Sequence, residues 1–199
     1  MGAWNVAILN PKWIASEIMK IPAGTPIPME LGLGPSISVK AKIADLIFIP
    51  SSERLLISPS KEDEEMFKGT DEAVEKIYSL LPYTPIEAVG YNFLYELEEN
   101  EDFLVGINFQ ASHYNEMYKD IGASAGSESA IQHSLALFDD AYVILNLLLK
   151  ISGKKKLLSF NYHYQVNDNK EKIKQSLNKF YKNYKHSQTV TQKLIKVVI

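Results

Sequence analysis

The stretch FNYHYQVNDNKEKIK, residues 160–174, places a strand pattern directly before a helix start. Its first half alternates large aromatic residues with polar ones. This period of two is typical of a β-strand that has one face in a core. The alternation extends to neighbouring residues and predicts a strand over 156–166.

The second half of the same stretch carries the signals of a helix N-terminus. Asp168 is a favourable N-cap residue, and Glu171 three positions later completes a capping box. The pattern predicts a helix over 169–186 with one apolar stripe and lysines on its remaining surface. The stripe consists of Ile173, Leu177, Phe180, Tyr181 and Tyr184.

A shorter stretch, YNFLYELEEN at 91–100, repeats the aromatic alternation. Aligned with 160–169, it is identical at Asn92 and Asn161, at Tyr95 and Tyr164, and at Asn100 and Asn169. A duplication would explain these identities. Alternation alone dictates half of the match, however, so two central strands with a shared amphipathic pattern are the favoured interpretation. We expect both to bury their aromatic faces together with Val143, Leu145, Leu147 and Leu149.

The rest of the chain adds one more helix and further strands. Thr70 as N-cap predicts a helix over 70–81, which Pro82 and Pro85 end. Residues 194–199 fit either a helical piece or a terminal strand. Turn residues separate short apolar runs that predict strands over 3–9, 37–49, 54–57, 86–98, 103–109, 131–138 and 142–151.

These elements predict an α+β fold. We expect a mostly antiparallel β-sheet of about seven to eight strands, with the helices near 70–81 and 169–186 packed on one face. A single domain over 1–199 is the primary expectation, with 1–110 and 111–199 as the alternative two-part organisation.

The composition limits the function classes. Of the 199 residues, 46% are hydrophobic and 23% are charged, which suits a globular protein with a substantial core. No run approaches the roughly 20 apolar residues of a membrane helix, and we expect no membrane association. The N-terminal residues do not resemble a signal peptide. The absence of cysteine excludes disulfides, thiolate metal sites and cysteine nucleophiles, and favours a cytoplasmic location.

The net charge of −3 conceals a division along the chain. Residues 1–149 contain 9 lysines and arginines against 22 acidic residues, whereas 150–199 contain 12 against 2. Such a division indicates either an internal complementary contact or a charged partner. The candidate binding residues are lysines of the basic part, namely Lys154, Lys155, Lys156, Lys170, Lys172, Lys174, Lys179, Lys182 and Lys185.

Catalytic and metal-binding patterns are weak. Gly122–Gly126 fits the G-x-S-x-G pattern around Ser124, and Asp139 or Asp140 and then His163 follow in hydrolase order. No alternation of strands and helices surrounds it, so a serine hydrolase is a distant alternative. The four histidines, His113, His133, His163 and His186, lack metal-ligand spacing, although His133 and His163 could face each other across strands. We predict no metal and no cofactor.

The sequence therefore favours a non-catalytic intracellular interaction protein that self-associates or binds a protein partner. Its acidic body and basic C-terminal helix would be the contact surfaces. The alternative is nucleic-acid binding through the lysine-rich region 150–196, because ammonium groups on one surface attract phosphate backbones.

Overall fold

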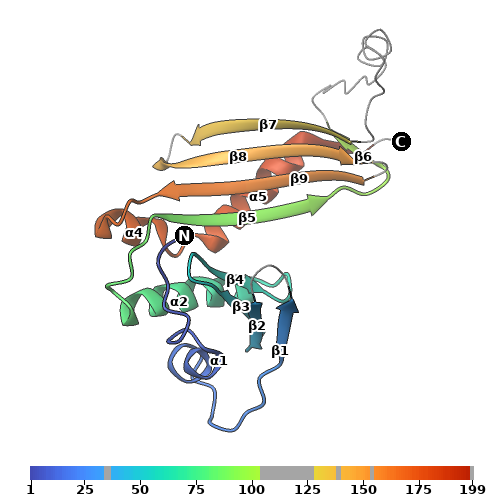
Figure 1. Ribbon diagram of the computed structural model, residues 1–199. Coiled ribbons are helices and arrows are strands. Elements are labelled where there is room, and N and C mark those ends of the chain that lie inside the picture. The colour runs from blue at the N-terminus through green and yellow to red at the C-terminus, as the bar shows by residue number, and fades with distance from the viewer. Residues whose placement is uncertain (34–36, 104–127, 138–139, 153–154, 198–199) are drawn as a thin grey trace, which may run out of the picture. The chain divides into compact units, whose positions relative to one another are not determined.

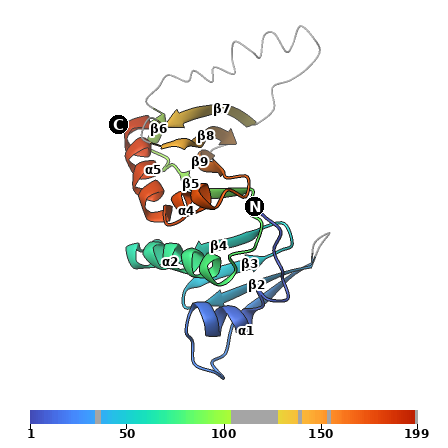
Figure 2. The ribbon, with the colours of Figure 1, turned by 90° about the vertical axis from the view of Figure 1, so that its left-hand side faces the viewer.

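A computed structural model describes residues 1–33, 37–103, 128–137, 140–152 and 155–197 (Figure 1, Figure 2). The chain forms two compact units. The first unit comprises Met1–Gly90 and Tyr164–Asn183, and the second comprises Tyr91–His163 and Tyr184–Ile199. The predicted α+β fold with antiparallel sheets is confirmed. One feature of the prediction is corrected, because the strands are divided among separate sheets instead of joining in one.

The sheet of the first unit is a four-stranded antiparallel meander. Its strands are β1 (Met29–Leu33), β2 (Ile37–Ile43), β3 (Leu46–Pro50) and β4 (Leu55–Pro59), in that spatial order.

The single strand predicted over 37–49 is wrong, since a tight turn at Ala44 and Asp45 divides it into β2 and β3. Both turn residues have positive φ, 48° and 64°. A two-residue hairpin of type I′ requires this geometry and usually takes Asn-Gly there, which is why Ala-Asp gave no signal. Residues 3–9, also predicted as a strand, form turns and bends instead.

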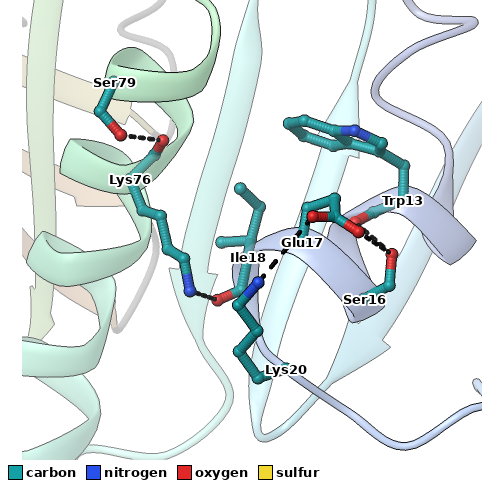
Figure 3. Close-up of polar contacts among 7 residues, drawn as sticks. All are labelled: Trp13, Ser16, Glu17, Ile18, Lys20, Lys76 and Ser79. Carbon is teal, nitrogen blue, oxygen red and sulfur yellow. Dashed lines mark hydrogen bonds and ion pairs between the residues drawn. The ribbon is translucent and has the colours of Figure 1, made fainter.

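A long helix and a short π-helix complete the core of the first unit. The π-helix η1 (Ile14–Ile18) follows the single turn α1 (Pro11–Trp13), and α2 (Glu64–Leu80) contacts η1 and β4. Lys76 on α2 donates through Nζ to the carbonyl oxygen of Ile18 at 2.8 Å, which satisfies an acceptor at the end of η1 (Figure 3). The buried cluster consists of Leu9, Ile14, Ala15, Ile18, Ala41, Ile43, Leu46, Phe48, Ala73 and Ile77.

The helix predicted over 70–81 begins six residues earlier than expected, at Glu64. Its N-cap is Asp63, whose Oδ1 accepts from the backbone N–H groups of Glu65 and Met66 at 2.8 and 3.3 Å. Thr70, the predicted N-cap, is buried inside the helix and donates through Oγ1 to the Met66 carbonyl. The predicted end is confirmed, because the helix stops before Pro82.

The helix predicted over 169–186 is two helices, α4 (Lys170–Ser176) and α5 (Phe180–Leu194). Between them Asn178 adopts the left-handed conformation at φ 56°, which asparagine tolerates better than most residues. The α4 cap is also displaced by one position: the side chain of Asn169 accepts from the Lys172 N–H. Asp168 accepts instead from the backbone N–H of Ile86.

Asp71 on α2 supplies the cap of α5. Its two carboxylate oxygens accept from the backbone N–H groups of Phe180 at 2.8 Å and Tyr181 at 3.2 Å. These are donors that the first turn of a helix leaves without an intrahelical partner. Asp71 is only 5% exposed, and this burial raises the pKa of its carboxyl above 3.8. The two hydrogen bonds oppose that rise, and the nearby charge of Glu75 adds to it.

The second unit contains most of a four-stranded antiparallel sheet in the order β5-β9-β8-β7. The strands are β5 (Ala88–Glu96), β7 (Glu128–Leu137), β8 (Asp140–Ser152) and β9 (Lys155–Gln165). The predicted meander of the last three is confirmed. A short strand β6 (Glu101–Phe103) pairs with β10 (Ile195–Val197), which decides between the two alternatives for 194–199 in favour of a strand. Beyond Phe103, the predicted strand over 103–109 lies outside the described residues.

One face of this sheet packs against α5. The Tyr162 hydroxyl lies 2.7 Å from His186 Nδ1, and the Tyr95 hydroxyl lies 2.7 Å from Ser187 Oγ. The rings of Phe93 and Tyr184 also meet, with centroids 5.9 Å apart. The prediction that both aromatic strands bury one face is therefore confirmed, and the predicted core residues Val143, Leu145, Leu147 and Leu149 are buried with them.

Candidate functional site

The opposite face of the sheet in the second unit, here called the open face, is the surface that stands out. Along β9 the buried residues Leu158, Phe160 and Tyr162 alternate with residues that point the other way. Within the described part of this unit, α5 is the only helix, and it lies on the aromatic side. The open face includes Asn92, Leu94, Gln132, Ser134, Ala136, Ile144, Asn146, Leu148, Ser159, Asn161 and His163.

A chain of side-chain hydrogen bonds, here called the amide ladder, crosses all four strands on the open face. Ser134 Oγ donates to Asn146 Oδ1 at 2.7 Å, and Asn146 Nδ2 donates to Asn161 Oδ1 at 3.2 Å. Asn161 Nδ2 then donates to Asn92 Oδ1 at 2.7 Å. Every donor points in the same direction across the sheet, so the bond dipoles align and reinforce one another.

Apolar side chains flank the amide ladder on the open face. Leu94 on β5 is 68% exposed and Ile144 on β8 is 48% exposed. Leu94 and Asn92 lie two positions apart on one strand, as do Ile144 and Asn146, so each apolar residue is the same-face neighbour of a ladder residue. The centre of the open face carries no Asp, Glu, Lys or Arg among the described residues.

Charged groups lie towards one end of the same sheet. Lys155 Nζ lies 2.9 Å from Glu96 Oε1. Lys156 Nζ lies 3.4 Å from Asp102 Oδ1 and donates to the Glu101 carbonyl at 2.7 Å. Lys155 and Lys156, both predicted binding lysines, are thus paired with carboxylates of the acidic part of the sequence.

The charge division along the sequence largely disappears in the fold. The first unit contains 13 lysines and arginines against 14 acidic residues, and the second contains 8 against 10. Their formal charges are therefore −1 and −2, in place of the −13 and +10 of the two parts of the sequence. Each unit therefore combines residues of the acidic part and of the basic part of the sequence.

The other predicted lysines are distributed over two helices. Lys170, Lys172 and Lys174 lie on α4, and Lys182 and Lys185 lie on α5. Lys179 precedes α5, and its ammonium group lies 5.3 Å from the ring centroid of Tyr164. Lys170 and Lys185 lie similarly over Tyr83 and Tyr184, at 5.7 and 5.9 Å. Lys154 lies outside the described residues.

Lys170 and Lys174 line a groove of about 440 Å³ that α2 and α4 form within the first unit. Glu75 and Tyr78 of α2 line its other wall. Two predicted binding lysines therefore meet side chains that are about 100 positions away in the sequence.

Only some of the predicted hydrolase and metal residues lie within the described part of the chain. Ser124, Asp139 and His113 lie outside the described residues. His133 is paired in register with Leu147, whose side chain is buried, whereas His163 lies on the open face, so the two histidines point to opposite sides of the sheet. No group of three or more His, Cys, Asp or Glu with the geometry of a metal site occurs in the described part of the chain.

Sequence reasoning missed the amide ladder. Asn92 and Asn161 were aligned as equivalent residues of two similar strands, and the structure shows them as hydrogen-bonded neighbours on antiparallel strands. Periodicity showed that each points away from the aromatic face. It carried no information on the sheet order that places the strands side by side.

No helix of the described residues is both long and apolar enough to cross a membrane. Comparison of the chain with protein-family models, curated proteins and solved structures gave no match.

Proposed function

We propose that this chain is a non-catalytic cytoplasmic protein that associates through the open face of its second unit, and that the associating partner is a second copy of the chain. The observation that carries the proposal is the uncharged centre of the open face. There, Leu94 and Ile144 are exposed beside a hydrogen-bonded amide ladder.

The composition of the open face resembles an interface more than a solvated surface. Antiparallel sheets commonly expose one face to water, but such a face is normally polar along every strand. Protein interfaces are depleted of charge at their centre and carry charge at their rim. The open face follows this second pattern, because its Lys155–Glu96 ion pair lies beyond the uncharged centre.

The amide ladder favours a second copy as the partner. Its aligned dipoles run from the hydroxyl of Ser134 to the carboxamide of Asn92. A two-fold axis parallel to the strands would place two such ladders antiparallel, so that the donor-rich end of one faces the acceptor end of the other. Carboxamides both donate and accept, and the same row can therefore pair with itself.

The open face is large enough for such an interface. Four strands spaced about 4.8 Å apart, with about ten residues each at about 3.3 Å per residue, present roughly 600 Å² per copy. Two copies would bury about 1,200 Å², which is the lower limit of standard stable interfaces. We therefore expect a dissociation constant in the micromolar range.

Nucleic-acid binding has weaker support. Lys155 and Lys156 are paired with carboxylates, and neither unit carries a net positive charge. Phosphate binding depends on unneutralised ammonium groups that release counterions, and affinity falls steeply with salt.

Sedimentation equilibrium of the parent and of Ile144→Lys tests the proposal. Ile144→Lys places a charge in the centre of the open face and should weaken dimerisation at least about tenfold. The matched control is Leu80→Lys, because Leu80 on α2 is 47% exposed against 48% for Ile144. Leu80→Lys should dimerise like the parent, and thermal unfolding of all three proteins should show that they are folded.

A parent protein that remains monomeric up to ~1 mM would overturn self-association. Equal dimerisation by Ile144→Lys and the parent would show that another surface forms the dimer. Titration of the same samples with random-sequence DNA and RNA at about 50 and 200 mM salt tests the alternative function, nucleic-acid binding. Tight binding that weakens with salt would favour nucleic-acid binding through the lysine-rich region.

A further inference from the structure

We infer that the groove between α2 and α4 is a binding site for a small amphipathic anion, that is, a flat apolar body with one carboxylate or similar group. This inference is independent of the proposed dimer, because the groove lies wholly within the first unit. Six of its lining residues carry the argument: Glu75, Tyr78, Pro82, Lys170, Lys174 and Leu177.

Helical spacing explains why these side chains meet. Glu75, Tyr78 and Pro82 follow one another at intervals of three and four along α2 and its end. Lys170, Lys174 and Leu177 have the same spacing along α4 and its cap. Residues three or four apart share one face of a helix, so each helix presents a single row to the groove.

The charges in the groove favour an anion. Two lysines and one acidic residue, Glu75, line the groove, so the formal charge of its lining is +1. Lys170 Nζ lies 5.7 Å from the ring centroid of Tyr83, an arrangement that restrains its position. Among the described residues Lys174 is in no ion pair, whereas Lys155 and Lys156 are each paired with a carboxylate.

The remaining surface of the groove favours an apolar body on the ligand. Leu177 is buried, and Tyr78 and Pro82 supply an aromatic ring and a pyrrolidine ring. A volume of about 440 Å³ lies in the lower half of the range for small-molecule sites, 300 to about 1,000 Å³. A mainly apolar lining with a few polar groups is usual for such sites, and two of the polar groups here are lysines.

The test is a titration of ¹⁵N-labelled full-length protein with 2-naphthoate, followed by amide chemical shifts, beside the neutral analogue 2-naphthylmethanol. We expect naphthoate to shift amides in 75–83 and 170–177, and to bind at least about fivefold more tightly than the alcohol. Equal affinity for the two compounds, or shifts confined to other regions, would overturn the inference.

Three variants sharpen the result. Lys174→Gln should weaken naphthoate about two- to fivefold, and Glu75→Gln should strengthen it by a similar factor, because each changes one charge at an exposed site. Lys182→Gln is the matched control, since Lys182 is an exposed lysine of α5 that does not line the groove. If Lys182→Gln and Lys174→Gln weaken naphthoate binding equally, the effect comes from the overall charge of the protein, and a localised site is refuted.

The naphthoate titration remains informative if the protein does not dimerise. Naphthoate binding is measured at amides of the first unit, and the oligomeric state is measured by sedimentation. Failure of one experiment therefore leaves the other result intact.

Discussion

Asp71 offers a prediction with a defined sign and size, because one buried carboxylate caps a helix that begins 109 residues later in the sequence. In Asp71→Ala the N–H groups of Phe180 and Tyr181 lose their acceptors. Replacing an N-cap by alanine costs about 0.5–2 kcal/mol of the free energy of unfolding. A donor left unsatisfied in a partly buried position costs about 1–3 kcal/mol.

Removing the carboxylate also has a favourable effect. Burial raises the pKa of Asp71, because it disfavours the ionised form of the carboxyl in the folded state. Asp71→Ala removes the cost of burying this carboxylate, which offsets part of the loss in the free energy of unfolding. We therefore expect Asp71→Ala to lower the free energy of unfolding by about 1–2 kcal/mol at pH 7. Asp71→Asn keeps one acceptor and should lose less.

The pH dependence follows from the direction of the pKa shift. The folded protein binds the Asp71 proton more tightly than the unfolded chain, whose value is near 3.8. This contribution to stability is fully present below about pH 3.8 and is lost as the pH rises through the higher pKa of the folded state. Relative to Asp71→Asn, which does not titrate, the parent should therefore become less stable as the pH rises through this window.

Urea unfolding of parent, Asp71→Asn and Asp71→Ala between about pH 3 and 8 measures these differences. Amide hydrogen exchange at Phe180 and Tyr181 reports the cap locally, and it should accelerate in Asp71→Ala. A parent that gains stability over Asp71→Asn with rising pH would refute the reasoning, because that is the behaviour of a carboxylate with a lowered pKa.

Two further substitutions test the fold. Tyr162→Phe removes the hydroxyl that lies 2.7 Å from His186 Nδ1 in the core of the second unit, and should lower the free energy of unfolding by about 0.5–2 kcal/mol in urea titrations; an unchanged midpoint would show that this hydrogen bond adds nothing. Asn178→Gly should be close to neutral, whereas Asn178→Ala should cost about 1 kcal/mol, because φ is 56° at this position. Equal melting temperatures for these two variants would argue against the left-handed conformation.

The two aromatic strands were predictable because their signal is local. Alternation along Phe160, Tyr162 and Tyr164 makes one side of β9 apolar, and such a side is stable only when it is buried in a core. The meander of β7, β8 and β9 was predictable for the same reason, since short turns join consecutive strands. The division into separate sheets was not predictable, because no local signal tells which strands pair over long distances.

The helix termini show where local reasoning fails. Thr70 and Asp63 are both acceptable N-caps, and packing of Phe67 and Thr70 in the core favours the earlier one. The interruption at Asn178 depends on Asp71, which caps the second helix from more than 100 residues away. The open face and the groove likewise consist of residues that are far apart in the sequence. Each residue type was visible in the sequence, but its neighbours come from other parts of the chain.

The long separation between Asp71 and Phe180 also bears on how the protein is made. The buried cluster of the first unit draws only on residues 9–77, so it can pack soon after these residues leave the ribosome. Phe180 and Tyr181, whose backbone N–H groups Asp71 caps, lie about 100 residues further along the chain, and the ring of Phe180 packs against Phe67 of α2. At typical rates of about 5–20 residues per second, they follow about 5–20 s later. During that interval Phe67 lacks the ring of Phe180, so the nascent chain exposes an aromatic side chain that is buried in the finished protein.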